Sequence, residues 1–203
     1  LGMHRLWKKR FVEIVDLKEN EIILDVGSGS GDIANEILKE NIPTNLYLLD
    51  LNEEMLLEGR KRLKKEKNIK YFIGNAEKLN FENNFFDKYT ISFCLRNVTE
   101  YLLSIKEAYR VLKPGGKYCC LEFSTPRSSL ISSSYKVYKL KILPLLGEIV
   151  AKDKNAYKYL SESIDLFPSQ EELSKNLLDC GFTRVETINL FNGIVAIHTG
   201  YKL

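Results

Sequence analysis

Apolar residues follow two alternating patterns along the first half of the chain. Short continuous apolar runs are typical of buried strands, and apolar residues spaced three and four apart are typical of amphipathic helices. The runs predict strands at residues 21–26, 46–49, 69–73, 89–94 and 117–123, and the spaced pattern predicts helices at residues 30–41, directly after Asn52, and at 102–112. This alternation predicts a mostly parallel, doubly wound α/β sheet with helices on both faces.

The pattern changes after Phe123. Residues 125–168 are rich in Ser, Tyr, Lys and Leu and are predicted to form a helical insertion after the fifth strand, within one domain that spans residues 1–203. A helix is predicted at residues 171–178, and strands at 185–190 and 194–200 flank Phe191-Asn192-Gly193. An Asn-Gly pair between two strand patterns indicates a hairpin, so the sheet is expected to end in an antiparallel C-terminal strand.

Composition agrees with one globular domain. Of 203 residues, 44% are hydrophobic and 28% are charged, which excludes a disordered chain. The net charge of +3 is too small to indicate a nucleic-acid partner. The four cysteines form no Cys-x-x-Cys pair and have no histidine at metal-ligand spacing, so we expect reduced, buried thiols and no metal site. The chain begins at Leu1, so we expect a further N-terminal segment, where a targeting sequence would lie.

A glycine-rich loop carries the first functional signal. The first strand runs into Asp25-Val26-Gly27-Ser28-Gly29-Ser30-Gly31, at the amino end of the next predicted helix. The third glycine of a dinucleotide fingerprint would stand at position 32, where Asp32 would repel a pyrophosphate. Asp25 suits a cationic ammonium group. The loop therefore predicts a zwitterionic nucleoside ligand, with Asp25, Gly27 and Gly29 among its contacts.

Two further strand ends fit the same ligand. Asp50 ends the second strand about 20 residues beyond the loop, where a carboxylate can accept both ribose hydroxyls. Asn75-Ala76 follows the third strand, where an amide can accept from an adenine amino group and a small neighbour leaves room for the ring. The ordered set of loop, Asp50, Asn75-Ala76 and the strand ending at Ile91-Ser92-Phe93 resembles the layout of class I S-adenosylmethionine-dependent methyltransferases. That resemblance implies a Rossmann-like fold.

A narrower resemblance extends over the whole chain. It is to the ubiquinone/menaquinone biosynthesis C-methyltransferase family. The segments that carry it are Gly2-Met3-His4-Arg5-Leu6-Trp7, the run Ile91–Thr99 with Leu95-Arg96-Asn97-Val98, Arg110–Gly116, Leu121-Glu122-Phe123-Ser124, Tyr157–Ile164 and His198-Thr199-Gly200-Tyr201-Lys202. The resemblance implies S-adenosyl-L-methionine as cofactor, held by Ser30, Asp50, Asn75, Ala76 and Ser92.

The family resemblance also implies the substrate and the reaction. The expected acceptor is a polyprenyl benzoquinol or naphthoquinol lipid, methylated on a ring carbon. The resemblance also implies a cytoplasmic or mitochondrial-matrix enzyme with peripheral contact at the inner membrane. It leaves open whether the protein forms a homodimer or joins a larger quinone-biosynthesis complex. A nucleic-acid methyltransferase is not expected, because no Asn/Asp-Pro-Pro-Tyr motif follows the fourth strand.

Arg96 and Asn97 are the predicted catalytic residues. A ring carbon becomes nucleophilic when the adjacent hydroxyl loses its proton, so the site needs a proton acceptor and a group that stabilises the phenolate. Arg96 follows the fourth strand and would hold the phenolate or orient a water, and Asn97 would fix that water. The apolar and basic residues in 135–146 predict a lid over the prenyl tail or a segment at the membrane interface.

Two other functions remain compatible with the motifs. One is a methyltransferase for another small phenol, sterol or polyketide. The other is a non-catalytic cofactor-binding partner in a biosynthetic complex. The intact loop together with Asp50 and Arg96 argues against the second.

Overall fold

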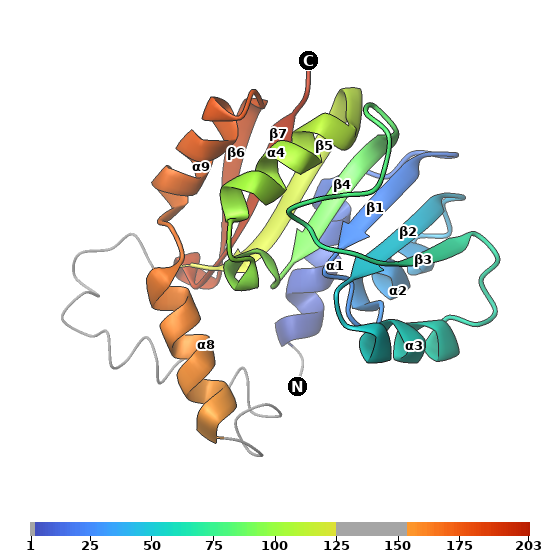
Figure 1. The fold of residues 1–203 in the computed structure, drawn as a ribbon, viewed down its shortest axis with the longest axis horizontal. Coiled ribbons are helices and arrows are strands. Elements are labelled where there is room, and N and C mark those ends of the chain that lie inside the picture. The colour runs from blue at the N-terminus through green and yellow to red at the C-terminus, as the bar shows by residue number, and fades with distance from the viewer. Residues whose placement is uncertain (1–2, 125–153) are drawn as a thin grey trace.

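The computed structural model describes residues 3–124 and 154–203 (Figure 1). The lid or interface segment predicted at residues 135–146 lies outside these residues. The strands are β1 (Ile22–Val26), β2 (Asn45–Asp50), β3 (Ile69–Ile73), β4 (Phe86–Ser92), β5 (Leu112–Phe123), β6 (Thr183–Leu190) and β7 (Val195–Tyr201). The α-helices are α1 (Met3–Val15), α2 (Asp32–Lys39), α3 (Glu53–Arg62), α4 (Tyr101–Val111), α8 (Lys154–Leu166) and α9 (Gln170–Asp179), and η1 (Leu95–Asn97) and η3 (Phe191–Gly193) are single 3-10 turns.

The strands form one seven-stranded sheet in the order β3-β2-β1-β4-β5-β7-β6. Neighbouring strands from β3 through β5 pair in parallel, and β7 pairs antiparallel with both β5 and β6. The predicted Rossmann-like sheet with its antiparallel C-terminal strand is therefore confirmed. Asn192, at φ 58°, makes the left-handed turn of the predicted hairpin.

Helices cover both faces of the sheet (Figure 1). One buried cluster joins α1 through Trp7 and Phe11 to α2 and α3, and the opposite cluster joins α4 and α9 through Ile105 and Leu173. The strand order reverses between β1 and β4, which is where α/β sheets of this kind bind ligands, at the carboxyl ends of the strands. None of the described helices is both long and apolar enough to cross a bilayer.

The structure corrects the predicted elements at three points, two strand boundaries and one helix. The strand predicted at 117–123 begins at Leu112, because Leu112 pairs with Phe86 and residues Gly115 and Gly116 exchange backbone hydrogen bonds with Lys202. The strand predicted at 89–94 runs from Phe86 to Ser92 and ends before Phe93, whose φ of 52° breaks the extended conformation.

The third correction concerns α1. Helix α1 was not predicted, although it buries apolar side chains at helical spacing: Trp7, Phe11, Val12 and Val15. That spacing, read over residues 3–15, is the signal that finds it.

Candidate cofactor and acceptor site

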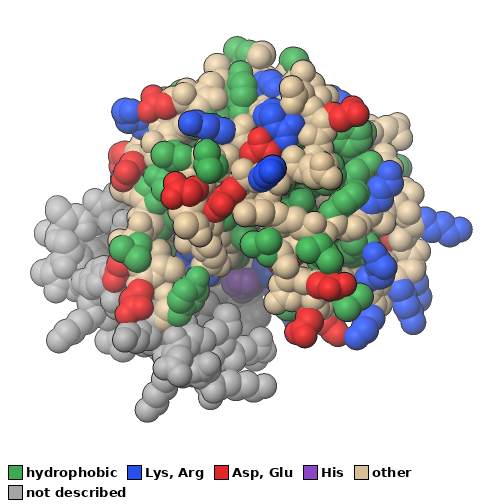
Figure 2. Space-filling model, in the orientation of Figure 1, with side chains coloured by type: hydrophobic (Ala, Val, Ile, Leu, Met, Phe, Trp, Pro, Cys, Tyr) green, Lys and Arg blue, Asp and Glu red, His purple; other side chains and the backbone are tan. Residues whose placement is uncertain are grey.

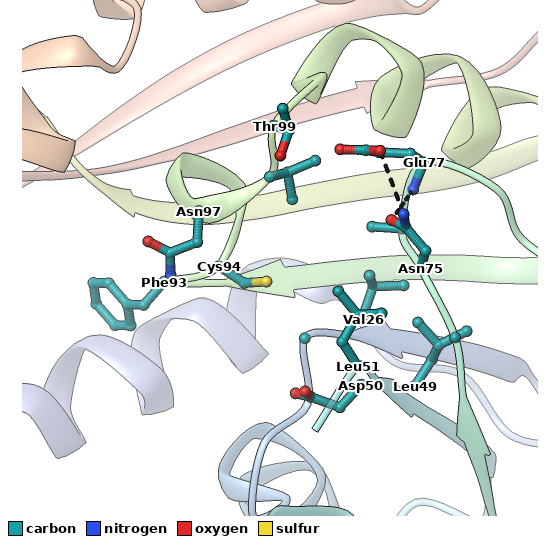
Figure 3. A pocket seen from close by; sticks show the side chains of 14 residues that line it. Val26, Leu49, Asp50, Leu51, Asn75, Glu77, Phe93, Cys94, Asn97 and Thr99 are labelled. Carbon is teal, nitrogen blue, oxygen red and sulfur yellow. Dashed lines mark hydrogen bonds between the residues drawn. The ribbon is translucent and has the colours of Figure 1, made fainter. Parts of the chain in front are cut away.

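A cavity of about 380 Å³ lies at the carboxyl ends of β1, β2, β3 and β4 (Figure 3). It is lined by Val26, Gly27, Leu49, Asp50, Leu51, Gly74, Asn75, Ala76, Glu77, Phe93, Cys94, Asn97, Val98 and Thr99. Five of the predicted site residues are among them: Gly27, Asp50, Asn75, Ala76 and Asn97. In Figure 3, Asn75 and Glu77 lie on one side of the space, and Phe93 and Asn97 on the other. The volume is in the range of small-molecule and cofactor sites.

Gly27 of the glycine loop lines this cavity beside Cys94. Gly27 has φ 63°, and a Cβ there would lie 2.2 Å from the Cys94 sulfur, so no larger residue fits. Burial raises the pKa of the Cys94 thiol to about 12, and the nearby Glu122 adds to the rise. The thiol therefore stays protonated and is a poor nucleophile toward a bound methyl donor.

Asp50 joins the loop to the start of α3. Its Oδ2 accepts the backbone N–H of Gly29 at 2.7 Å, and its Oδ1 accepts the backbone N–H of Asn52 at 2.9 Å. Asn52 caps α3 as predicted, because its Oδ1 accepts the N–H of Met55. A carboxylate has about four lone-pair sites, so each Asp50 oxygen can still accept from a ribose hydroxyl.

The segment after β3 is folded by its own side chains. Asn75 Oδ1 accepts the backbone N–H of Glu77 at 2.9 Å, and Asn75 Nδ2 donates to Glu77 Oε2 at 3.3 Å. Glu77 Oε1 accepts the backbone N–H of Glu100 at 2.9 Å, which ties this segment to the start of α4. Glu77 lines the cavity and was not predicted as a site residue, although it follows Ala76 directly.

Asp25 lies beneath the loop and does not line the cavity. It is 1% exposed, its Oδ1 accepts from the Thr90 hydroxyl at 2.8 Å, and its buried Oδ2 has no hydrogen-bond partner among the described residues. Burial raises the pKa of Asp25 to about 7, and the charge of Asp50 adds to the rise. Direct contact of Asp25 with a cofactor therefore stays a prediction, and its clearest structural property is an unsatisfied buried carboxyl.

Three further predicted contacts also lie outside the cavity lining. Gly29 and Ser30 belong to the loop, and Ser92 ends β4 paired with Leu121. Their assignment as cofactor contacts stays a prediction.

The residue that replaces the third fingerprint glycine has a structural role. Asp32 begins α2 and binds both Lys8 of α1 and Arg62 of α3. Burial opposes ionisation, but the hydrogen bonds from Lys8 and Arg62 hold the pKa of Asp32 at about 2. Asp32 thus joins three helices next to the glycine loop.

Arg96 does not line the cavity, whereas Asn97 does. The Arg96 guanidinium donates through Nη1 to Glu122 Oε1 at 2.8 Å and to the Phe93 carbonyl at 2.6 Å. The side chains of this ion pair are 10% and 2% exposed. Burial raises the pKa of Glu122, and Arg96 opposes that rise. The direct catalytic role of Arg96 stays a prediction, and Glu122 is a partner that sequence reasoning did not assign.

A hydrogen bond connects Asn97 to the end of the insertion. Asn97 Oδ1 accepts from the Tyr159 hydroxyl of α8 at 3.2 Å. Because Asn97 lines the cavity, this hydrogen bond brings α8 to the cavity's edge. The Tyr159 side chain is otherwise exposed.

His4 lies on the other side of Phe93, and sequence reasoning gave it no role. Its ring stacks on the Phe93 ring at a centroid distance of 4.9 Å. Burial lowers the pKa of His4 to about 4, and the positive charge of Lys8 lowers it further, so the imidazole is neutral at pH 7. Figure 2 shows histidine surface inside a hollow of this face. Of the two histidines, His4 is partly buried and His198 is 2% exposed. His198 instead contacts the Gln170 carbonyl within the fold.

The sheet order, the glycine loop and the strand-end residues define a class I S-adenosylmethionine-dependent methyltransferase. The model of the ubiE/COQ5 methyltransferase family matches residues 1–202, and the chain belongs to this family. The family, the enzyme class and the cofactor predicted from the sequence are thereby confirmed.

Curated relatives agree with the family match. The relative from Rickettsia bellii named "Ubiquinone/menaquinone biosynthesis C-methyltransferase UbiE" is 49% identical over 212 residues, covering 100% of this chain and 84% of the relative. The relative of the same name from Rickettsia prowazekii is 48% identical over 213 residues, with the same coverage.

Solved structures share the fold at low identity. A SAM-dependent methyltransferase from Aquifex aeolicus has a TM-score of 0.70 at 19% identity, covering 97% of this chain and 89% of that one. Phosphoethanolamine N-methyltransferase 2 of Haemonchus contortus, in complex with S-adenosyl-L-methionine, has a TM-score of 0.73 at 18% identity, covering 96% and 52%.

Proposed function

We propose that this protein transfers the methyl group of S-adenosyl-L-methionine to a ring carbon of a polyprenyl benzoquinol or naphthoquinol in ubiquinone or menaquinone biosynthesis. The observation that carries the proposal is the cavity that brings Gly27, Asp50, Asn75 and Asn97 together in a member of this methyltransferase family. The names of the curated relatives support the same acceptor class.

The residues around the cavity fit the cofactor. Asp50 has free lone pairs for the ribose hydroxyls while two backbone N–H groups hold it in place. Asn75 and the small Ala76 border the space for an adenine ring, and Gly27, which has no side chain, leaves room beside Cys94. When bound, the cofactor supplies an electrophilic methyl group on a cationic sulfur.

The chain's own residues bind and orient the acceptor. The opposite side of the cavity, with Phe93 and Asn97, is left for the acceptor ring. Asn97 presents an amide that Tyr159 holds in place, which suits a hydroxyl or an ordered water next to the ring. Positioning two reactants in line supplies much of the rate enhancement in methyl transfer.

Transfer of labelled methyl groups tests this function. The full chain is incubated with S-adenosylmethionine labelled in the methyl group and with a short-chain benzoquinol or naphthoquinol. We expect label in the ring of at least one quinol, and the ratio of the two rates gives the acceptor preference. Asp50→Ala should lose incorporation, and Glu58→Ala, an exposed carboxylate paired with Lys61, is the matched control. Absence of label from both quinols, with the cofactor bound, would contradict the proposal and favour a non-catalytic partner.

We further propose peripheral membrane contact, because the acceptor's tail is a hydrocarbon. Exposed apolar side chains on α1, α3 and α8 support this: Leu6, Met55, Leu57, Tyr159 and Leu166. Co-sedimentation with vesicles of mixed zwitterionic and anionic phospholipid should recover the protein, and Leu166→Ser should reduce the bound fraction. Recovery no greater than that of protein without vesicles would contradict it. A homodimer or a larger complex, and a site at the inner membrane facing the cytoplasm or matrix, stay predictions.

A further inference from the structure

We propose that Glu122 and Arg96 are positioning residues whose buried ion pair fixes Phe93, and that the ring of Phe93 forms the wall against which the acceptor's aromatic ring binds. This inference rests on the proposed function, because it takes a quinol as the acceptor. It gives the ion pair a role through Phe93 rather than through contact with the reacting atoms.

The backbone of Phe93 is in a conformation that needs support. Its φ of 52° lies in the left-handed region, which a bulky side chain rarely adopts unless its surroundings impose it. Its N–H donates to the Leu121 carbonyl at 2.7 Å, and its carbonyl accepts from Arg96 Nη1 at 2.6 Å. Both polar groups of this residue are therefore held, one by β5 and one by Arg96.

Glu122 in turn holds Arg96. Its Oε1 accepts from Arg96 Nη1 at 2.8 Å and from the backbone N–H of Phe123 at 2.8 Å. The carboxylate is almost fully buried, so it is fixed by β5 and has little freedom to follow a ligand. Neither member of the pair lines the cavity, whereas Phe93 does. The residue that carries their influence into the site is therefore Phe93.

The ring of Phe93 lies on the side of the cavity opposite Asn75. In Figure 3 it points away from Asn75 and toward α1. There it belongs to a cluster of rings, 4.9 Å from His4, 4.8 Å from Phe123 and 6.3 Å from Trp7. Aromatic rings bind one another at centroid separations of roughly 4.5–7 Å. Trp7 and Phe123 are buried, so the partly exposed rings of Phe93 and His4 are the surface that this cluster offers to another aromatic ring. In the proposed reaction, the quinol is the reactant whose aromatic ring binds on this side of the cavity, opposite Asn75.

Trp7 provides a readout that needs no turnover. It is the single tryptophan of the chain and packs in the same cluster of rings. A quinone quenches indole fluorescence at short range, so a tail-less benzoquinone titrated into the protein should quench Trp7 in a saturable way.

A double-mutant cycle tests the proposal. Phe93→Ala and Glu122→Gln should each raise the KM for a tail-less quinol about 5- to 20-fold and weaken quenching by a similar factor, with affinity for S-adenosylhomocysteine within about twofold. In the Phe93→Ala background, Glu122→Gln should add less than about twofold. If the KM of the double variant rose by the product of the two single-variant factors, the proposal would be overturned, because the ion pair would then act independently of Phe93.

Matched controls come from the same chain. Phe191→Ala removes another phenylalanine with positive φ, 49° at the hairpin, and Glu107→Gln weakens another ion pair, with Arg110. Neither should change the KM. If Glu122→Gln does not fold, Phe93→Leu and Phe93→Tyr decide the matter, since only the second keeps the aromatic wall and should bind as wild type.

The two proposals fail separately. A wild-type protein that methylates no quinol refutes the proposed function. A Phe93→Ala protein that binds the tail-less ring as tightly as wild type refutes the wall, whatever the methylation assay gives.

Discussion

The carboxylate of Asp50 and the backbone N–H of Gly29 are joined by a hydrogen bond of 2.7 Å. This hydrogen bond ties the glycine loop to the end of β2. Asp50, which is predicted to bind ribose, therefore also holds the conformation of the loop. A substitution at Asp50 therefore removes a ligand contact and a loop contact together.

Asp50→Ala should weaken binding of S-adenosylhomocysteine by about 2 kcal/mol, roughly 30-fold, because two ribose hydroxyls lose their acceptor. Calorimetry on the folded variant measures this. Asp50→Asn keeps one oxygen acceptor and should lose less. An unchanged affinity in Asp50→Ala would remove this residue from the cofactor site.

Arg96→Ala should raise the KM for the quinol about 5- to 20-fold, as Phe93→Ala does, while S-adenosylhomocysteine affinity stays within about threefold; a loss of kcat of at least ~100-fold would instead assign Arg96 to the reacting atoms. It also leaves Glu122 as a buried charge without its partner, which typically costs about 3–5 kcal/mol of stability. Kinetics and denaturant unfolding on the same preparation separate the effects. Wild-type kinetics would end any role for Arg96 in catalysis.

Cofactor binding should depend on pH through Asp25. Its pKa of about 7 means that the carboxyl is largely protonated below neutrality, and a cationic ligand favours the ionised form. Affinity for S-adenosylmethionine should therefore rise from pH 6 to pH 8, with proton release on binding. In calorimetry, Asp25→Asn should flatten this slope. A variant with the wild-type slope would assign the titration to another group.

His4 should make the protein less stable in mild acid. Its folded pKa of about 4 lies below the ordinary value of 6.5, so between these values the unfolded chain binds a proton that the folded protein does not. The free energy of unfolding therefore keeps the full contribution of neutral His4 above pH 6.5 and loses it as the pH falls toward 4. Lys8 and Asp32 face the same ring and are unchanged in His4→Phe, which keeps the stack on Phe93. The Tm of the His4→Phe variant should fall less than that of the wild-type protein between pH 7 and pH 4.5.

Tyr159→Phe should lower kcat for the quinol about 3- to 10-fold without changing cofactor affinity, because Asn97 loses the donor that fixes its amide. Tyr101→Phe removes a comparable hydroxyl, bonded to Asn176 on α9, and is the control. Equal rates in the two variants would show that the contact of Tyr159 with Asn97 has no role in turnover.

Local signals account for what the sequence could predict. Five apolar runs and one Asn-Gly turn located the strands. Asp50 and Asn75 could be placed because Asp50 ends β2 and Asn75 follows shortly after β3. The pair of Arg96 and Glu122 could not be predicted, since the partners are 26 positions apart and meet only when β4 and β5 align. The same is true of Phe93, because nothing in its neighbours' identities dictates a positive φ.

The order of strands has a consequence for biosynthesis of the protein. Among the described residues, those that line the cavity all lie between Val26 and Thr99, so they come from one early stretch of the chain. The aromatic wall also needs Glu122 and Phe123 on β5, and β5 becomes an interior strand only when β7 pairs with it. The acceptor side therefore depends on a hairpin, β6 and β7, that follows the cavity-lining residues in the sequence. During synthesis, the strands that carry the cofactor residues therefore leave the ribosome before the hairpin that completes the aromatic wall.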